Sequence, residues 1–224
     1  MSESSILPGA DVPRPTRQRL WAEFGTLFIG VPILMAVFFG LYPLFPVILA
    51  LAAVSAVLLW RTPGFSFREL WRGPVLGEWR LILGFALALG VGSLGAAAVL
   101  VPDSLFVIPR ERPALWLMIM VFYPLLSAVP QEIIFRPLFF RRYGALFPNE
   151  GVAVFANALV FGMGHLFYMN PITILMTVFA GAIFGWSYLR HRSFLLTCVL
   201  HAIAGQIVFT VGLGRYFYHG AVGG

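Results

Sequence analysis

Residues 114–140 read ALWLMIMVFYPLLSAVPQEIIFRPLFF, a run in which Glu132 and Arg136 are the only charged residues. An α-helix needs roughly 20 apolar residues to cross about 30 Å of hydrocarbon, and this run exceeds that length. A charge near the bilayer centre costs at least about 2.5–3.5 kcal/mol on insertion scales. The run therefore predicts a membrane-spanning helix in which each of the two charges needs a specific reason to be present.

The composition of the whole chain agrees with a lipid environment. Of 224 residues, 60% are hydrophobic and only 11% are charged, whereas roughly 25% are charged in an average soluble domain. All 15 basic residues are arginine, against 9 acidic residues, and in a membrane protein this excess is typical of cytoplasmic loops. We therefore expect the lipid bilayer as a partner and no nucleic acid. The single cysteine, Cys198, excludes an intramolecular disulfide and a CxxC metal knuckle.

Further apolar stretches of similar length flank this run on both sides. Together they predict seven spans, at residues 20–40, 43–60, 81–101, 114–140, 151–169, 171–189 and 194–213. The predicted fold class is all-α, a polytopic transmembrane bundle of about seven spans, between six and eight. The predicted organisation is a polar tail at 1–19, N-terminal helices at 20–113, a helical core at 114–213 and a short tail at 214–224.

Residues 61–80, RTPGFSFRELWRGPVLGEWR, join the second and third predicted spans. Arginine side chains alternate there with phenylalanine and tryptophan, which is typical of a segment that lies at the membrane interface. A disordered loop is the alternative, because the prolines and glycines of this segment would break a long helix.

The arginines also predict the orientation of the bundle, because positive charges near the ends of spans resist translocation. One alternate set of loops holds 11 of them, namely Arg14, Arg17, Arg19, Arg61, Arg68, Arg72, Arg80, Arg141, Arg142, Arg190 and Arg192. The other set holds only Arg110, Arg112 and Arg215. With seven spans, the N-terminus is predicted to be cytoplasmic and the C-terminus to lie outside.

Small residues predict where these helices approach one another. Gly181 and Gly185 are four positions apart and form a GxxxG face, and Gly92 with Ala96 forms a similar one. Such faces let two helix backbones come close together in lipid.

The ionisable residues predicted to lie within the membrane are Glu132, Arg136, His165 and His201. Glu132 and Arg136 are four positions apart, so on a helix they share a face and can pair. A purely structural ion pair is one interpretation of them. At 1.5 Å per residue, Glu132 and His201 each lie about 13 Å from the nearest arginine-rich loop, which is a matched depth. His165 lies about 22 Å from Glu150. All three side chains thus fall within roughly 7 Å of the midplane of a 30 Å core. His165 is the outlier, which predicts a fifth helix that is tilted or begins later.

The fourth span also carries three prolines, Pro124, Pro130 and Pro137, on both sides of Glu132. Each removes a hydrogen bond from the helix, so the span should be kinked around Glu132. Such a kink could make room for water.

A carboxylate and two imidazoles at similar depth permit three kinds of chemistry. The carboxylate and one imidazole can activate water for attack on an amide, while the second imidazole stabilises the oxyanion. Glu132, His165 and His201 could instead hold a divalent metal such as zinc with an open position. The two histidines could also be axial ligands of a haem. The sequences HExxH and GxSxG, typical of zinc proteases and serine hydrolases, are both absent.

Three motifs resemble those of the CPBP family (CAAX protease and bacteriocin-processing, or Abi), which are intramembrane glutamic endopeptidases. QEIIFR, from Gln131 to Arg136, resembles the EExxxR motif of that family. FGMGH, from Phe161 to His165, resembles its FxxxH motif, and His201 resembles the histidine of its HxxxN motif. The order and spacing of the three fit the family over roughly residues 114–213.

The resemblance implies a helical bundle with a cavity open toward the cytoplasm. It also implies hydrolysis, by activated water and without a cofactor, of a peptide bond in a membrane-associated or lipidated protein or peptide. In the family, the first glutamate of EExxxR and the FxxxH histidine activate the water, and the histidine and asparagine of HxxxN stabilise the oxyanion. The residues that follow from it are catalytic Glu132, His165 and His201, with Gln131, Arg136, Phe161 and Gln206 in support.

Two positions depart from the family pattern. Gln131 stands where the first glutamate is expected, and Gly205 stands where the asparagine is expected. A glutamine cannot accept a proton as a general base, and a glycine has no side-chain donor. One hypothesis is that Glu132 takes over as base, weakened by its pairing with the arginine, while Gln131 or Gln206 donates to the oxyanion. The other is a catalytically inactive family member that acts as a membrane binding or scaffold protein.

Overall fold

The computed structural model describes residues 15–38 and 43–217, and over these ranges the chain is helical and has no β-strand. The longer helices are α1 (Arg17–Gly25), α2 (Val31–Val37), α3 (Leu44–Trp60), α4 (Trp79–Leu100), α6 (Pro113–Tyr123), α8 (Glu150–Met163), α9 (Pro171–His191) and α10 (Phe194–Val211). Two further α-helices, α5 (Val107–Glu111) and α7 (Val129–Ile133), have five residues each. Three π-helices are present: η1 (Thr26–Gly30), η5 (Pro124–Ala128) and η6 (Ile134–Tyr143). Short 3₁₀ helices complete the fold: η2 (Phe67–Trp71), η3 (Leu76–Glu78), η4 (Pro102–Ser104), η7 (Gly144–Leu146), η8 (Leu166–Tyr168) and η9 (Leu213–Phe217).

Six helical stretches of the described chain are long and apolar enough to cross a membrane. They are Arg17–Val37, Leu76–Leu100, Pro113–Leu146, Glu150–Tyr168, Pro171–His191 and Phe194–Val211. The apolar helix α3, with 17 residues, is shorter. The protein is therefore an all-α polytopic membrane bundle, which confirms the predicted fold class of six to eight spans.

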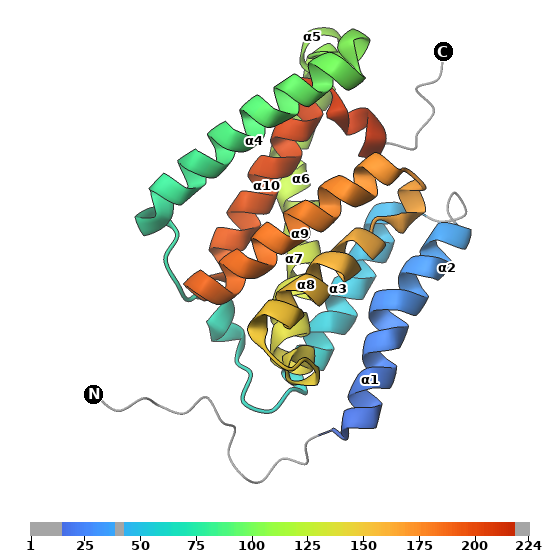
Figure 1. The fold of residues 1–224 in the computed structure, drawn as a ribbon, viewed down its shortest axis with the longest axis vertical. Coiled ribbons are helices and arrows are strands. Elements are labelled where there is room, and N and C mark those ends of the chain that lie inside the picture. Colours follow the sequence, from blue (N-terminus) through green and yellow to red (C-terminus); the bar gives the residue numbers. More distant parts are fainter. Residues whose placement is uncertain (1–14, 39–42, 218–224) are drawn as a thin grey trace.

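The helices are arranged so that the C-terminal ones lie at the centre of the bundle. In Figure 1, α1 and α2 follow each other along one side, α4 lies along the opposite side, and α8, α9 and α10 lie between them. The pairs α8 with α9 and α4 with α10 share extensive contacts. The fourth span, α6 to η6, passes behind them and contacts both α3 and α10. It thus connects the N-terminal and C-terminal helices.

The fourth span changes its hydrogen bonding at each proline, as predicted. Pro124 begins the π-helix η5, Pro130 lies in the first turn of α7, and Pro137 lies inside the π-helix η6. Proline has no N–H to donate, so the regular ladder of an α-helix is interrupted. Glu132 is therefore carried by a short α-helical segment between two wider turns, an arrangement often found at functional sites.

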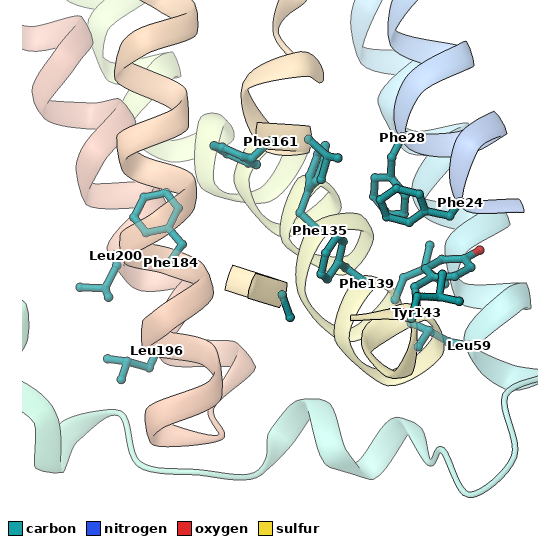
Figure 2. Close-up of a cluster of buried hydrophobic side chains, with 14 residues drawn as sticks. Phe24, Phe28, Leu59, Phe135, Phe139, Tyr143, Phe161, Phe184, Leu196 and Leu200 are labelled. Atoms are coloured by element: carbon teal, nitrogen blue, oxygen red, sulfur yellow. The ribbon is translucent and has the colours of Figure 1, made fainter. Parts of the chain in front are cut away.

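Aromatic side chains form the core between α1 and η6. Figure 2 shows Phe24 and Phe28 of the first span facing Phe135, Phe139 and Tyr143 of the fourth. All five are buried, and the Phe24 and Phe28 ring centroids are 5.1 Å apart. This core continues through Phe161 and Phe184 toward the C-terminal helices, so it supports the region that carries the predicted site.

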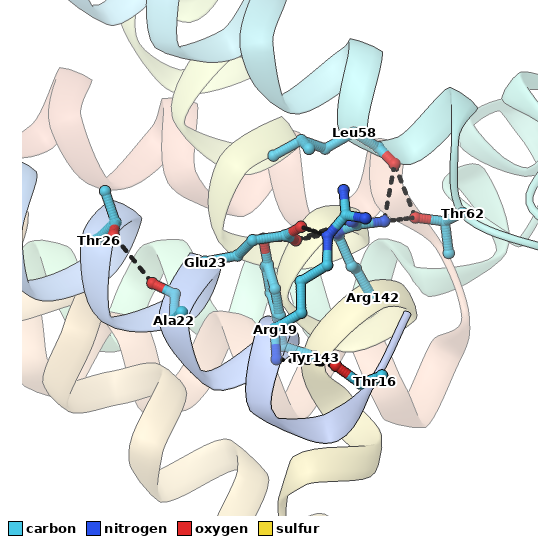
Figure 3. Close-up of polar contacts among 9 residues, drawn as sticks. All are labelled: Thr16, Arg19, Ala22, Glu23, Thr26, Leu58, Thr62, Arg142 and Tyr143. Carbon is cyan, nitrogen blue, oxygen red and sulfur yellow. Dashed lines mark hydrogen bonds and ion pairs between the residues drawn. The ribbon is translucent and has the colours of Figure 1, made fainter. Parts of the chain in front are cut away.

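Arginines of the larger predicted set hold the loops together at one end of the bundle. Arg142 forms an ion pair with Glu23 of α1 at 2.7 Å and donates to Thr62 Oγ1 after α3 at 3.1 Å (Figure 3). Arg141 pairs with Glu69 of η2 at 3.2 Å. The orientation of this end toward the cytoplasm stays a prediction.

Residues 61–80 contain the two short 3₁₀ helices η2 and η3, joined by turns, and reach the start of α4 at Trp79. A capping box joins Ser66 and Glu69 at the start of η2. Trp71 and Leu76 remain 75% and 89% exposed beside the arginine-rich end. An interfacial position for this segment fits that exposure and stays a prediction.

The structure confirms one predicted small-residue face and corrects the other. An added Cβ at Gly181 would stand 2.9 Å from Phe161 Cβ, and one at Gly185 would stand 2.8 Å from Asn157 Oδ1. At Gly92 an added Cβ would meet nothing within 4 Å, so the prediction of close packing there is wrong. The buried residues of α4 are instead Ser93 and Ala97, one position further along, and these define the face of α4 that is covered.

Candidate functional site

The charged pair of the fourth span is completely buried. Glu132 and Arg136 both have an exposed fraction of 0%. Arg136 donates from Nε to Glu132 Oε2 at 2.8 Å and from Nη2 to Oε1 at 3.5 Å. This geometry neutralises both charges away from water, which is the condition under which a buried ion pair is tolerated.

Asn157 of α8 also accepts a hydrogen bond from Arg136. This residue was not predicted from the sequence. Its Oδ1 accepts a hydrogen bond from Arg136 Nη1, and its Nδ2 donates to the Phe135 carbonyl at 2.7 Å. The signal for it is a single amide side chain in the otherwise apolar stretch 151–163. Asn157 thus fixes the position of the fourth span against α8.

His201 of α10 completes a buried network with the carboxylate. Its Nδ1 donates to Glu132 Oε1 at 2.8 Å, and its ring stacks on Phe184 with a centroid distance of 5.2 Å. We name Glu132, Arg136, Asn157 and His201 the ion cluster. It links the fourth span to α8 and α10 through buried, charge-assisted hydrogen bonds, which are stronger than neutral ones.

His165 lies beyond the end of α8, in the turn that leads into η8. The α-helix ends at Met163, and the fifth span continues through this turn to Tyr168, close to the predicted 151–169. His165 Nδ1 lies 2.8 Å from the Phe161 carbonyl oxygen. A carbonyl can only accept, so Nδ1 carries the proton and the neutral ring keeps Nε2 as an acceptor.

Phe161 lies between His165 and the ion cluster. Its ring centroid is 4.9 Å from the His165 ring and 5.6 Å from the His201 ring. The Arg136 guanidinium carbon lies 5.0 Å from the same ring centroid. The structure therefore brings Glu132 and His201 into direct contact, whereas His165 reaches this pair only through an aromatic ring.

Metal-ligating side chains are dispersed in the part of the chain that the structure describes. Over residues 15–38 and 43–217, no three His, Cys, Asp or Glu side chains converge closely enough to hold a metal ion. A metal bound by Glu132, His165 and His201 stays a prediction. Two Glu132 oxygens and one nitrogen of each histidine are already engaged in hydrogen bonds within the protein.

A cavity of about 1300 Å³ lies beside this cluster, between the fourth span, α2 and α3. Its lining is mostly apolar, as is usual for ligand sites. The polar side chains in the lining include Tyr123, Ser127, Gln131 and His165, and we name these four the cavity wall. Of the ion cluster, none of the four residues lines the cavity.

The two predicted glutamines have different environments. Gln131 lines the cavity and donates from Nε2 to Ser127 Oγ at 2.8 Å. Gln206 donates from Nε2 to the Met120 carbonyl at 2.8 Å and does not line the cavity. Gln131 is therefore placed to meet a ligand, whereas Gln206 connects α10 to α6.

These elements define an integral membrane protein in which a buried ion cluster lies beside a mostly apolar cavity that has a few polar side chains in its lining. Residues 113–205 match the family model described as type II CAAX prenyl endopeptidase Rce1-like. This match agrees with the CPBP resemblance carried by the three motifs, over the same part of the chain. No curated protein and no solved structure gave a significant match.

Proposed function

We propose that this protein is an endopeptidase that hydrolyses a peptide bond of a membrane-associated or lipidated protein within the cavity. The observation that carries the proposal is the position of His165 in the cavity wall with Nδ1 bonded to the Phe161 carbonyl. This bond leaves Nε2 as the proton acceptor, which is the form required of a general base. The family match over residues 113–205 supports the reaction class.

In the proposed reaction, His165 Nε2 takes a proton from water as the water oxygen attacks the carbonyl carbon of the peptide bond. The carbonyl oxygen becomes an oxyanion, and donors in the cavity wall stabilise it. When the C–N bond breaks, the protonated imidazole returns its proton to the leaving amine. The reaction needs no cofactor, and all protons are accounted for by water and His165.

Within this proposal, Glu132 acts through His201 and Arg136 rather than on the water. All its hydrogen bonds are made inside the ion cluster, and it has no exposed surface. This differs from the roles predicted for Glu132 as base and His201 as oxyanion donor. We infer that both are positioning residues, because they hold the fourth span and α10 on either side of Phe161.

A second candidate function is binding of a membrane-embedded peptide without hydrolysis. The observation that favours it is Gln131, which occupies the cavity-facing position of the first motif and cannot accept a proton. A family member with this residue would keep the cavity and lose the carboxylate that assists the histidine.

A cleavage assay in lipid nanodiscs tests both candidates. The probe is a fluorescent peptide that ends in an isoprenoid-modified CAAX sequence, and the variants are Gln131→Glu and His165→Ala. The endopeptidase proposal expects slow cleavage by the wild type, faster cleavage by Gln131→Glu and none by His165→Ala. Cleavage by Gln131→Glu alone, with binding by the wild type, would establish the second candidate instead.

A further inference from the structure

The fourth span faces the cavity with a phenol that the sequence motifs do not include. Tyr123, at the end of α6, lines the cavity one helical turn before Ser127 and two turns before Gln131. Its ring packs against Phe209 and His201 of α10, with centroid distances of 5.8 and 6.1 Å. The phenol is therefore held by α10 while it also belongs to the cavity wall.

The space for this phenol exists because residue 205 is glycine. A Cβ added at Gly205 would overlap the Tyr123 ring carbons and would stand 2.5 Å from the Tyr123 hydroxyl oxygen. His201 and Gly205 are one turn apart on α10, so the hydroxyl lies on the helix face that His201 shares. The phenol thus takes the place that a side chain at position 205 would have occupied.

The hydrogen bonds of the cavity wall show which donors are free. The Nδ1–H of His165 is used by the Phe161 carbonyl, and one N–H of Gln131 is used by Ser127 Oγ. Among the described residues, the Tyr123 hydroxyl has no hydrogen-bond partner in the structure. Tyr123 is half-buried and lines the cavity, so its unpaired hydroxyl is available to donate to a ligand bound there.

We propose that Tyr123 donates its hydroxyl hydrogen bond to the carbonyl oxygen of the peptide bound in the cavity. This deepens the proposed function and rests on it, since the ligand is the same membrane-associated peptide. Tyrosine is among the side chains that stabilise oxyanions in acyl transfer. The phenol would then supply, from the fourth span, the donor that Gly205 cannot supply from α10.

The test compares binding and cleavage of the fluorescent isoprenoid-modified peptide by wild type and Tyr123→Phe in nanodiscs. Phenylalanine keeps the ring that packs against Gly205 and removes only the hydroxyl. We expect binding to weaken about 3- to 10-fold, the net value of one hydrogen bond, and cleavage to slow about 100-fold, as for loss of an oxyanion donor. Tyr216→Phe, a tyrosine outside the cavity lining, is the matched control and should behave as wild type.

A rescue variant separates the donor from the packing. Tyr123→Ala combined with Gly205→Asn removes the ring and places an amide donor on α10 at the same point, and it should recover part of the binding and cleavage lost in Tyr123→Ala. If Tyr123→Phe binds and cleaves like the wild type, the role of Tyr123 is refuted while the proposed function stands. If the wild type neither binds nor cleaves the peptide, the proposed function fails and this inference fails with it.

Discussion

The ion cluster and the cavity wall are neighbours in the structure, but they differ in how far their polar groups are already hydrogen-bonded within the protein. Glu132, Arg136, Asn157 and His201 have exposed fractions of 4% or less and share a closed set of hydrogen bonds. The four side chains of the cavity wall carry no charge as long as His165 is neutral. They also keep donors and acceptors that no group of the described residues uses.

The comparison indicates that the charged residues of the ion cluster hold the helices together, whereas the neutral polar residues of the cavity wall are available to a ligand. In lipid, an unpaired charge is expensive and a closed ion pair is tolerable. A peptide ligand needs partners that are not already committed, and uncommitted neutral groups are less costly to keep in a cavity than uncommitted charges. The first three predictions below each compare one residue of the ion cluster with one residue outside it, and the last compares two glycines.

The largest expected effect is on cleavage, when the two histidines are compared. His165→Ala should lower the cleavage rate by about 10²- to 10⁴-fold, the usual contribution of a general base, and should leave the melting temperature close to that of the wild type. His201→Ala should lower both the cleavage rate and the melting temperature, because it removes the hydrogen bond from His201 to Glu132. Cleavage and thermal unfolding in detergent are measured on the same samples, and an active His165→Ala protein would contradict the assignment.

Removing the carboxylate of the ion cluster should have the largest effect on stability. Glu132→Ala leaves Arg136 buried without a counter-charge, which typically costs about 3–5 kcal/mol of unfolding free energy. Glu111→Ala, an exposed carboxylate of α5 without an ion pair among the described residues, is the control and should change little. Equal melting temperatures for the two variants would show that the ion cluster is not structural.

A smaller effect on stability is expected when the amide side chains of Asn157 and Gln131 are compared. Asn157→Ala leaves the Phe135 carbonyl and one Arg136 N–H unpaired, so we expect a loss of about 1–3 kcal/mol. Gln131→Ala removes a single hydrogen bond beside a cavity, for which we expect about 0.5–1 kcal/mol. Denaturation in mixed detergent measures both, and the reverse order would mean that the cavity wall, and not the ion cluster, carries the stability.

The pair with the smallest expected change in stability concerns Gly185, which leaves room for the Asn157 side chain. An alanine at Gly185 would place its Cβ 2.8 Å from Asn157 Oδ1, so Gly185→Ala should cost about 1–2 kcal/mol through overpacking. Gly92→Ala meets open space and should leave stability unchanged or slightly raised, because alanine favours helix. If both variants melt alike, close approach at Gly185 is not needed to seat Asn157.

Much of the candidate site follows from the linear sequence because helical spacing is regular. Glu132 and Arg136 are four residues apart, and on a helix that spacing alone places them on one face. The contact of His201 with Glu132 also agrees with the matched depths predicted for them. These inferences needed only the rise of a helix and the length of a span.

The remaining features could not be predicted because they depend on where helices end and which faces meet. His165 lies in a turn after α8, so its relation to Glu132 is not given by helix periodicity. The expected face at Gly92 failed because α4 packs one position further along, through Ser93 and Ala97.

Apolar length and the scarcity of charge established, before any coordinates, that this chain crosses a membrane several times and holds an ion pair inside it. Those properties depend on the transfer of residues between water and lipid, which is nearly additive along a chain. The placement of Gln131 and Tyr123 in the cavity, and of Glu132 away from it, depends on the rotation of the fourth span against α8 and α10. Rotation is set by packing between helices from distant parts of the chain, and local sequence does not contain it.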